Sequence, residues 1–225
     1  MVKRGRLIVF LGPVGVGKST IIRGLAQTLR SHGFRTCTVF IKAFHGPAYM
    51  LWAFIARLLS LNGKYAPWFK TSRSGRINLA KILLMLSIYL DAFFSKPLKL
   101  ILVRILRHIR YYVISEEYLY STIFDYIYSI ISINVRNRFV NISLEIINSL
   151  LNKYSPDITV VLMANVSELR HRWKTRGYGD PQLRYVLLQY AFLNKLNDAL
   201  HVDTSGINVK ETLHTVLNEV LKHGS

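Results

Sequence analysis

The sequence predicts an α/β fold in three layers, with a five-stranded parallel sheet and helices on both of its faces. Short apolar runs alternate with longer segments of helical periodicity, and this alternation is typical of a parallel sheet covered on both sides. The first run is apolar at every position, as expected of a strand buried on both faces. The five runs that we expect to form strands are Leu7 to Leu11, Thr36 to Ile41, Tyr111 to Ser115, Ile158 to Met163 and Leu200 to Asp203.

Length and composition limit the class of protein. At 225 residues the chain is long enough for one full-sized domain and short for two, so we expect a single domain over residues 1–225. A hydrophobic content of 51% excludes a wholly disordered chain. The single cysteine, Cys37, allows no internal disulfide. Only five apolar residues precede the first glycine-rich segment, too few for a secretory signal, and we therefore expect a cytoplasmic protein.

The charge is strongly unbalanced. The chain carries 30 Lys and Arg against 12 Asp and Glu, a formal net charge of +18. Such a surface attracts polyanions in general. A nucleic acid or an anionic lipid is therefore an open alternative for a partner, beside any small anionic substrate.

Two apolar segments invite comparison with membrane spans. Ala43 to Ala56 contains His45 and Pro47, and the run Ile82 to Leu90 stops at Asp91. Neither reaches about 20 residues, so we expect no transmembrane segment. Lys96 to Arg110 alternates cations with Leu and Ile as a basic amphipathic helix does. A helix packed on the core with a solvated cationic face is the favoured interpretation, and interfacial binding to a membrane is the alternative.

The most specific motif lies directly after the first expected strand. Residues 12–20 read Gly-Pro-Val-Gly-Val-Gly-Lys-Ser-Thr, a complete G-x-x-x-x-G-K-S/T phosphate-binding loop (P-loop, Walker A) followed by a helical pattern. Backbone amides and the helix N-terminus cradle phosphates in such loops. We expect ATP and Mg²⁺ as cofactors, with Lys18 reaching the terminal phosphates and Ser19 offering its hydroxyl to Mg²⁺. The predicted nucleotide-binding residues are Gly12, Pro13, Val14, Gly15, Val16, Gly17, Lys18, Ser19 and Thr20.

The loop predicts a P-loop NTPase fold but leaves the reaction open, because motors, GTPases, transporters and kinases share it. Four segments together resemble the thymidylate kinase-like branch of the nucleoside monophosphate kinases. They are the loop with its helix, Phe44-His45-Gly46-Pro47 after the second strand, Val113 to Asp125, and the pair Val166 to Gly177 and Val202 to Ser205.

This resemblance implies an ATP-dependent kinase that passes a phosphoryl group to a nucleotide. It implies that Glu116 holds Mg²⁺ with Ser19, and that a lid at about 166–182 closes Arg172 and Arg176 over the migrating group. The two arginines also stand four residues apart, on one face of a helix. The implied acceptor-binding residues are His45, Glu117, Tyr118 and Asp125. Related kinases often pair through helices, so a homodimer stays open.

Two residues depart from the family pattern. Glu117 stands where the family has an Arg that grips the acceptor phosphate, and Val14 stands where related loops often have Asp. A carboxylate facing a phosphate repels it. The residues expected to bind the donor, ATP, are thus present, whereas residues expected to bind the acceptor differ from the family pattern. The alternative function is therefore a P-loop ATPase or nucleotide-binding protein without a small acceptor, associated or not with nucleic acid.

Overall fold

The computed structural model describes residues 5–61, 67–177 and 182–222. The chain divides into two compact units, each built from separate segments. Unit 1 contains the described residues of 1–40, 103–118 and 156–225, and unit 2 those of 41–102 and 119–155. Each unit is described by itself below. The single domain expected from chain length stays a prediction.

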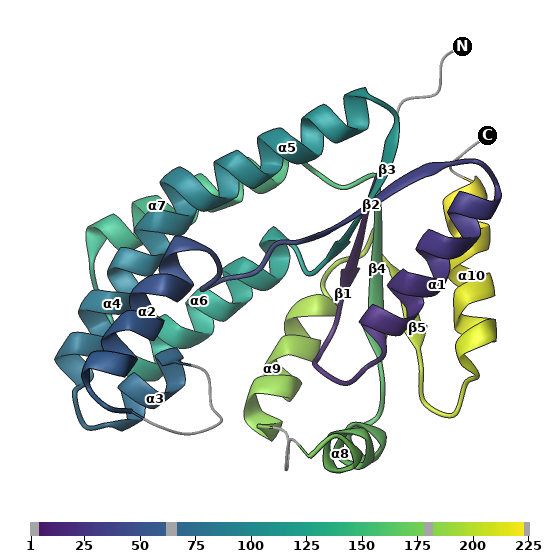
Figure 1. The fold of residues 1–225 in the computed structure, drawn as a ribbon. Helices are drawn as coiled ribbons and strands as arrows, with labels where there is room; N and C mark the ends of the chain where they lie inside the picture. Colours follow the sequence, from purple (N-terminus) through teal and green to yellow (C-terminus); the bar gives the residue numbers. More distant parts are fainter. Residues whose placement is uncertain (1–4, 62–66, 178–181, 223–225) are drawn as a thin grey trace. The chain divides into compact units, whose positions relative to one another are not determined.

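Unit 1 holds the sheet, and its strands confirm the predicted five-stranded parallel arrangement. The strands are β1 (Leu7–Leu11), β2 (Arg35–Phe40), β3 (Tyr111–Glu116), β4 (Ile158–Met163) and β5 (Leu200–Asp203). They pair in parallel in the order β2-β3-β1-β4-β5 (Figure 1). All five residues of β1 are buried, because this strand is central and lies between two neighbours. The loop after β1 is therefore fixed at the middle of the sheet's carboxyl edge.

Helices flank this sheet, as predicted for a three-layer P-loop NTPase fold. The helices of unit 1 are α1 (Lys18–Ser31), α8 (Val166–Thr175), α9 (Leu183–Leu193) and α10 (Val209–Lys222). Helices α1 and α10 lie side by side (Figure 1). Leu25 of α1 and Val216 of α10 join Ile8, Phe10 and Val160 of the sheet in one buried apolar cluster. The first helix is thus held firmly where its N-terminus follows the loop. Of the expected lid at 166–182, residues 178–181 lie outside the described part of the chain.

Unit 2 is helical in its described part. Its helices are α2 (Pro47–Leu58), α3 (Pro67–Arg73), α4 (Ile77–Leu90), the π-helical segment η1 (Asp91–Ser95), the first half of α5 (Lys96–His108), α6 (Leu119–Ile133) and α7 (Arg138–Lys153). Helix α4 packs against α2, α6 and α7. Trp52 of α2 is buried and donates from Nε1 to Ser87 Oγ of α4 at 2.6 Å.

One expectation about the apolar segments is wrong. We expected the run Ile82 to Leu90 to stop at Asp91, but α4, η1 and α5 form one continuous helix, Ile77–His108. In the part of the chain that the structure describes, this is the one helix long and apolar enough to cross a membrane by length and composition, with mean hydropathy 1.7. Such a helix is weak evidence for a span, because a core helix can meet the same criteria.

The helix continues through Asp91, whose charge is paired inside unit 2 through Oδ2, although Oδ1 is buried without a hydrogen-bond partner among the described residues. Asp91 Oδ2 lies 2.9 Å from Lys96 Nζ, and both side chains are fully buried. The Tyr126 hydroxyl donates to the same oxygen at 2.6 Å, and Lys96 also donates to the Lys42 carbonyl at 2.6 Å. Burial lowers the pKa of Lys96, against the opposing effect of Asp91, and burial raises the pKa of Tyr126. A buried ion pair with further hydrogen bonds is tolerated in a helix interior.

The faces of α5 match the favoured expectation of a core-packed helix with a solvated cationic face only in part. Arg104 is exposed and Leu100 is buried, but Lys96 is buried too, and Leu98, Ile101 and Leu102 are 67%, 47% and 51% exposed. The physical reason is that the ion pair with Asp91 turns Lys96 inward. The neighbouring row of aliphatic side chains then turns outward.

Candidate functional site

The candidate site lies at the carboxyl ends of β1 and β3, where ligands bind in open α/β sheets. Phe10 of β1 is in register with Glu116 of β3. The next backbone N–H, that of Glu117, donates to the Phe10 carbonyl at 3.0 Å. The P-loop after β1 and the two consecutive glutamates after β3 are therefore neighbours by strand pairing alone.

The loop has a left-handed backbone at three glycines, Gly12, Gly15 and Gly17, and the first and last of them shape its course. Gly12 has φ of 138°, and a Cβ there would lie 2.2 Å from the Leu162 carbonyl oxygen, too close for any side chain. Gly17 has φ of 105°, and its carbonyl accepts the N–H groups of Thr20 and Ile21, both at 3.1 Å. The backbone thus curls tightly and passes straight into α1, as a phosphate-binding loop requires.

The lysine of the P-loop is buried, and its ammonium group contacts oxygens of the protein. Lys18 is 5% exposed, and its Nζ donates to the carbonyls of Gly12 and Pro13, the latter at 3.0 Å. The same nitrogen lies 3.0 Å from Glu117 Oε1. An ammonium group has three N–H donors, and these three oxygens match them in number. In this structure the charge that we expect to meet phosphates is held by the protein's own oxygens.

Two oxygen-bearing side chains converge where the sequence predicts Mg²⁺. Ser19 Oγ lies 2.9 Å and 3.0 Å from the two carboxylate oxygens of Glu116. Protein sites for Mg²⁺ commonly supply one or two such ligands, with phosphate and water oxygens completing the octahedron. The pair therefore fits the ion. No cluster of three or more His, Cys, Asp and Glu side chains exists among the described residues, and the role of this pair in holding Mg²⁺ stays a prediction.

Glu117 lies beside the nucleotide loop. Its side chain is 3% exposed, where it pairs with Lys18. Its φ of 65° is unusual for a residue other than glycine. Two hydrogen bonds hold this backbone, because the Ser115 hydroxyl donates to the Glu117 carbonyl and the Glu117 N–H donates to Phe10. The carboxylate is thus aimed at Lys18 by local geometry. Its predicted contact with an acceptor stays a prediction.

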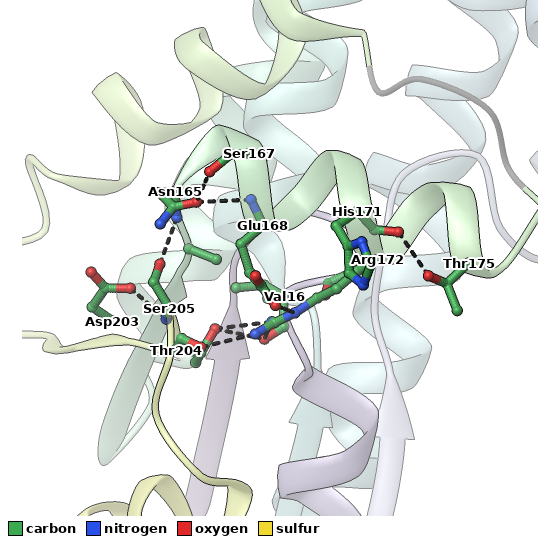
Figure 2. Close-up of polar contacts among 12 residues, drawn as sticks. Val16, Asn165, Ser167, Glu168, His171, Arg172, Thr175, Asp203, Thr204 and Ser205 are labelled. Carbon is green, nitrogen blue, oxygen red and sulfur yellow. Dashed lines mark hydrogen bonds and ion pairs between the residues drawn. The ribbon is translucent and has the colours of Figure 1, made fainter.

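The two predicted lid arginines occupy different positions on α8. Arg172 Nε binds Glu168 at 2.8 Å, and Nη2 donates to the Thr204 carbonyl at 2.9 Å (Figure 2). Its Nη1 is 3.3 Å from the Val16 carbonyl of the P-loop. Arg176 is the exposed residue that ends α8. Arg172 therefore joins α8, the P-loop and the segment after β5, and closure of both arginines over a phosphoryl group stays a prediction.

Sequence reasoning missed two residues that contact the loop. Trp173 Nε1 donates to the Val14 carbonyl at 2.7 Å, and its ring lies so close to Gly15 that a Cβ there would approach it to 2.9 Å. The Thr204 hydroxyl, buried after β5, lies 3.1 Å from the Val16 carbonyl. A tryptophan in an otherwise polar, cationic helix is a signal of such an anchor, whereas Thr204 carries no signal of its own.

The turns that carry these residues are themselves capped. Asn165 precedes α8, and its side-chain oxygen accepts from the Glu168 N–H at 2.8 Å. Its own N–H donates to Ser205 Oγ at 2.7 Å, and the Ser205 N–H donates to Asp203 at 2.8 Å (Figure 2). These bonds fix the ends of β4 and β5 to each other. Arg172 and Thr204 are held in place as a result.

A hollow of about 430 Å³ begins at Ser19 and Glu116. It runs between α1 and β2 of unit 1. Its lining includes Ser19 and Glu116 at one end, the cationic Arg23 and Arg30 of α1, and Phe40 of β2. Arg30 is held by its Nε, which donates to Thr36 Oγ1 at 2.7 Å. The hollow therefore combines an apolar wall with positive charge.

The four predicted acceptor residues belong to different units. Glu117 and the fully buried Tyr118 are in unit 1, and His45 and the buried Asp125 are in unit 2. Burial lowers the pKa of His45, although its Nδ1 contact with the Ala43 carbonyl at 2.8 Å acts in the opposite direction. Next to it, Phe44 stacks on Trp68 with ring centroids 5.0 Å apart. An acceptor role for these residues stays a prediction.

Comparisons with known proteins agree with the fold. No family model matches the sequence, and a search of curated proteins finds no significant match. Among solved structures, thymidylate kinase from Candida albicans is similar at 18% identity with a TM-score of 0.55, covering 99% of this chain and 94% of that one. Deoxyadenosine kinase from M. mycoides, solved with bound dCTP, is similar at 19% identity and a TM-score of 0.55, covering 96% and 99%. The chain therefore has a thymidylate kinase-like P-loop fold along nearly its whole length.

Proposed function

We propose that the protein is an ATP-dependent phosphotransferase whose acceptor is a nucleotide or a nucleoside. One observation carries this proposal: the Ser19 hydroxyl and the Glu116 carboxylate converge within 2.9 Å at the start of α1, directly after a complete P-loop. A loop that bound phosphate only as an anion would not need a carboxylate there, because the carboxylate repels phosphate unless a cation lies between them.

Each residue then has a role in transfer. The loop amides and Lys18 bind the phosphates of ATP, and Ser19 and Glu116 hold Mg²⁺, which supplies positive charge to the oxygens of the migrating group. Lys18 leaves Glu117 to reach these phosphates. Arg172 keeps α8 against the loop and so limits the access of water. These roles rest on the donor half of the site.

The acceptor class is supported by charge and by the solved neighbours. One neighbour is named a thymidylate kinase and the other a deoxyadenosine kinase. We infer a deoxynucleotide or deoxynucleoside acceptor for this chain. An anionic group placed in the hollow lined by Arg23 and Arg30 would lie beside the metal ligands. Because Glu117 replaces a cation, an uncharged nucleoside is as good a candidate as a monophosphate.

The test measures ADP released from ATP and Mg²⁺ in the presence of deoxynucleoside monophosphates, deoxynucleosides, and single- or double-stranded nucleic acid. Release that depends on one of the small acceptors supports the proposal. Release stimulated only by nucleic acid, or ATP binding without release, supports the alternative of an ATPase or nucleotide-binding protein. Absence of ATP binding to folded protein would overturn the assignment of the loop.

The first prediction concerns the loop lysine. Lys18→Ala should lower acceptor-dependent turnover by about a hundredfold or more, because it removes a charge aimed at the transferring phosphates. The matched control is Lys222→Ala, which removes an exposed lysine at the far end of α10 and should leave turnover unchanged. Equal activity of both variants would exclude the loop from the reaction.

A further inference from the structure

An unusual feature of unit 2 is a continuous row of exposed apolar side chains along one helix. Eight large apolar residues of α4, η1 and the first part of α5 are between 43% and 67% exposed: Ile82, Leu86, Tyr89, Phe93, Phe94, Leu98, Ile101 and Leu102. We name this row the apolar stripe. Side chains three and four residues apart on a helix are neighbours, so these residues form one contiguous patch. Patches of this kind on proteins mark interaction sites.

The π-helical segment keeps the stripe in line. From Ile82 the exposed positions follow steps of four, three and four to Phe93, which is the spacing of an α-helical face. Phe94 follows beside Phe93, and the step from Phe93 to the next residue on the same face, Leu98, is five residues and spans η1, where the Lys96 N–H bonds to the Asp91 carbonyl. That extra residue is what a π-helical turn accommodates. Without the π-helical turn, this extra residue would rotate the second half of the stripe away from the first.

The opposite face of the same helix is buried in the interior of unit 2. Leu84, Ser87 and Ile88 of α4 are buried, as are Asp91 and Lys96 with their partner Tyr126. A helix that spanned a bilayer alone would expose this ion pair to hydrocarbon at high cost. The helix therefore lies along a surface with one face outward.

Positive charge borders the stripe. A hollow of about 510 Å³ is lined by Lys81, Met85 and residues 134–137, among them the exposed Arg136. Lys81 and Met85 directly precede Ile82 and Leu86 of the stripe. The segments of unit 2 carry 12 Lys and Arg against three Asp and Glu. Basic residues near an anionic membrane surface are attracted to it.

From these observations we propose that the apolar stripe binds the surface of an anionic lipid bilayer, with lipid headgroups at Lys81 and Arg136. Apolar side chains beside cations are the composition of an interfacial helix. A second copy of this chain fits less well, because it would bring two strongly cationic surfaces together. The proposal is independent of the proposed kinase function.

The experiment measures co-sedimentation of the full chain with vesicles at about 100 mM salt, where surface attraction acts over about 10 Å. Vesicles of phosphatidylcholine alone are compared with vesicles containing about 30% phosphatidylglycerol, which adds the anionic charge. The wild-type chain should bind the anionic vesicles about tenfold more strongly, which corresponds to about 1.4 kcal/mol. Equal binding to both vesicles, or to neither, would overturn the proposal.

Three variants separate the contributions of the apolar side chains and of the cations to vesicle binding. Phe94→Ser/Leu98→Ser should lower binding about tenfold, because it removes two exposed apolar anchors. Lys81→Glu/Arg136→Glu should lower binding to the anionic vesicles alone. The matched control, Met50→Ser/Phe54→Ser, changes two residues of α2 that are 70% and 60% exposed and lie outside the stripe, and it should bind as the wild type does.

Folding and self-association complete the test. All six substituted positions are outside the buried core, and a thermal melt checks each variant for folding. If the stripe variant turns a dimer into a monomer in analytical ultracentrifugation while vesicle binding is unchanged, a second copy covers the stripe and the proposal is wrong. If the control loses as much vesicle binding as the stripe variant, the contact is nonspecific and the proposal is also wrong.

Discussion

The pair Lys18 and Glu117 is the most consequential contact at the scale of single residues. Both side chains are about 95% buried or more, and the loop carbonyls accept the lysine's other protons. A phosphate can reach this ammonium only by replacing an oxygen that already neutralises it. Under the proposed function we therefore expect Glu117 to compete with the ligand, lowering the affinity for nucleotide and stabilising the loop when none is bound.

The variant Glu117→Gln tests this competition. Removing the carboxylate charge should lower the Kd for ATP by about tenfold, because Lys18 then lacks an anionic partner and gains more from phosphate. The same variant should melt at a lower temperature without nucleotide. Isothermal titration calorimetry and a thermal melt measure the two effects, with Glu145→Gln, an exposed carboxylate of α7, as the control. Weaker ATP binding by Glu117→Gln would show that Glu117 assists the ligand.

At this scale the sequence predicted residue types better than contacts. The motif itself indicates that Lys18 and Ser19 belong to one loop, and Glu116 follows from the resemblance to the kinase family, which places an acid at the end of this strand. The partner of Glu117 could not be predicted, because it depends on a left-handed backbone at that residue and on the pairing of β1 with β3. The same holds for Asp91, whose partner Tyr126 is 35 residues away.

At the scale of elements, α8 is distinguished by side chains that donate hydrogen bonds to the P-loop and to the segment after β5. Arg172 reaches the carbonyls of Val16 and Thr204, and Trp173 reaches that of Val14. The contacts of α8 therefore depend on the conformation of the P-loop. Movement of the loop around a nucleotide must be accompanied by a change in these contacts.

The variant Arg172→Lys tests whether the hydrogen bonds of Arg172 hold α8 in place. Lysine cannot reproduce the planar fork that contacts several oxygens at once, so the amide protons of α8 should exchange with solvent about tenfold faster, the equivalent of one lost charged hydrogen bond. Hydrogen exchange followed by mass spectrometry measures this. Arg176→Lys, on the same helix but exposed at its end, should leave exchange unchanged. The same acceleration in both variants would contradict a specific role for Arg172.

Periodicity predicted the strands well, and the long helix poorly. The five strands follow from short apolar runs, and the structure confirms their number and parallel pairing. The continuous helix Ile77–His108 was missed because Asp91 and Lys96 resemble the ends of two separate segments. Their charges are instead neutralised by each other and by residues distant in the sequence, which no local pattern reveals.

At the scale of the whole molecule, the dominant property is the net charge of +18. With 30 Lys and Arg against 12 Asp and Glu, the carboxylates cannot neutralise most of the cations, and two of the ion pairs among the described residues, Lys18–Glu117 and Lys96–Asp91, are buried. The remaining cations repel one another across the folded surface. Self-repulsion of this kind destabilises a compact state and is weakened by salt.

We therefore expect salt to stabilise the protein. Raising NaCl from about 20 to about 300 mM should raise the melting temperature by about 2–4 °C, the shift that 1 kcal/mol produces in a chain of this size. Differential scanning fluorimetry measures the shift, and KCl serves as a control because only ionic strength should matter. A melting temperature that falls with added salt would mean that attraction between charges outweighs repulsion.

The π-helical segment Asp91–Ser95 has a genetic consequence. Each residue of an α-helix advances the chain by about 100° around the axis, and a π-helical turn absorbs one additional residue without that rotation. Deleting the codon of a residue in this segment other than Asp91 would therefore restore ordinary pitch and leave the later side chains on their present faces. The same deletion in the α-helical part before it would instead turn the later side chains by roughly 100° if the π-helical turn is kept, and Leu100, now wholly interior, would exchange its environment with the outward aliphatic row.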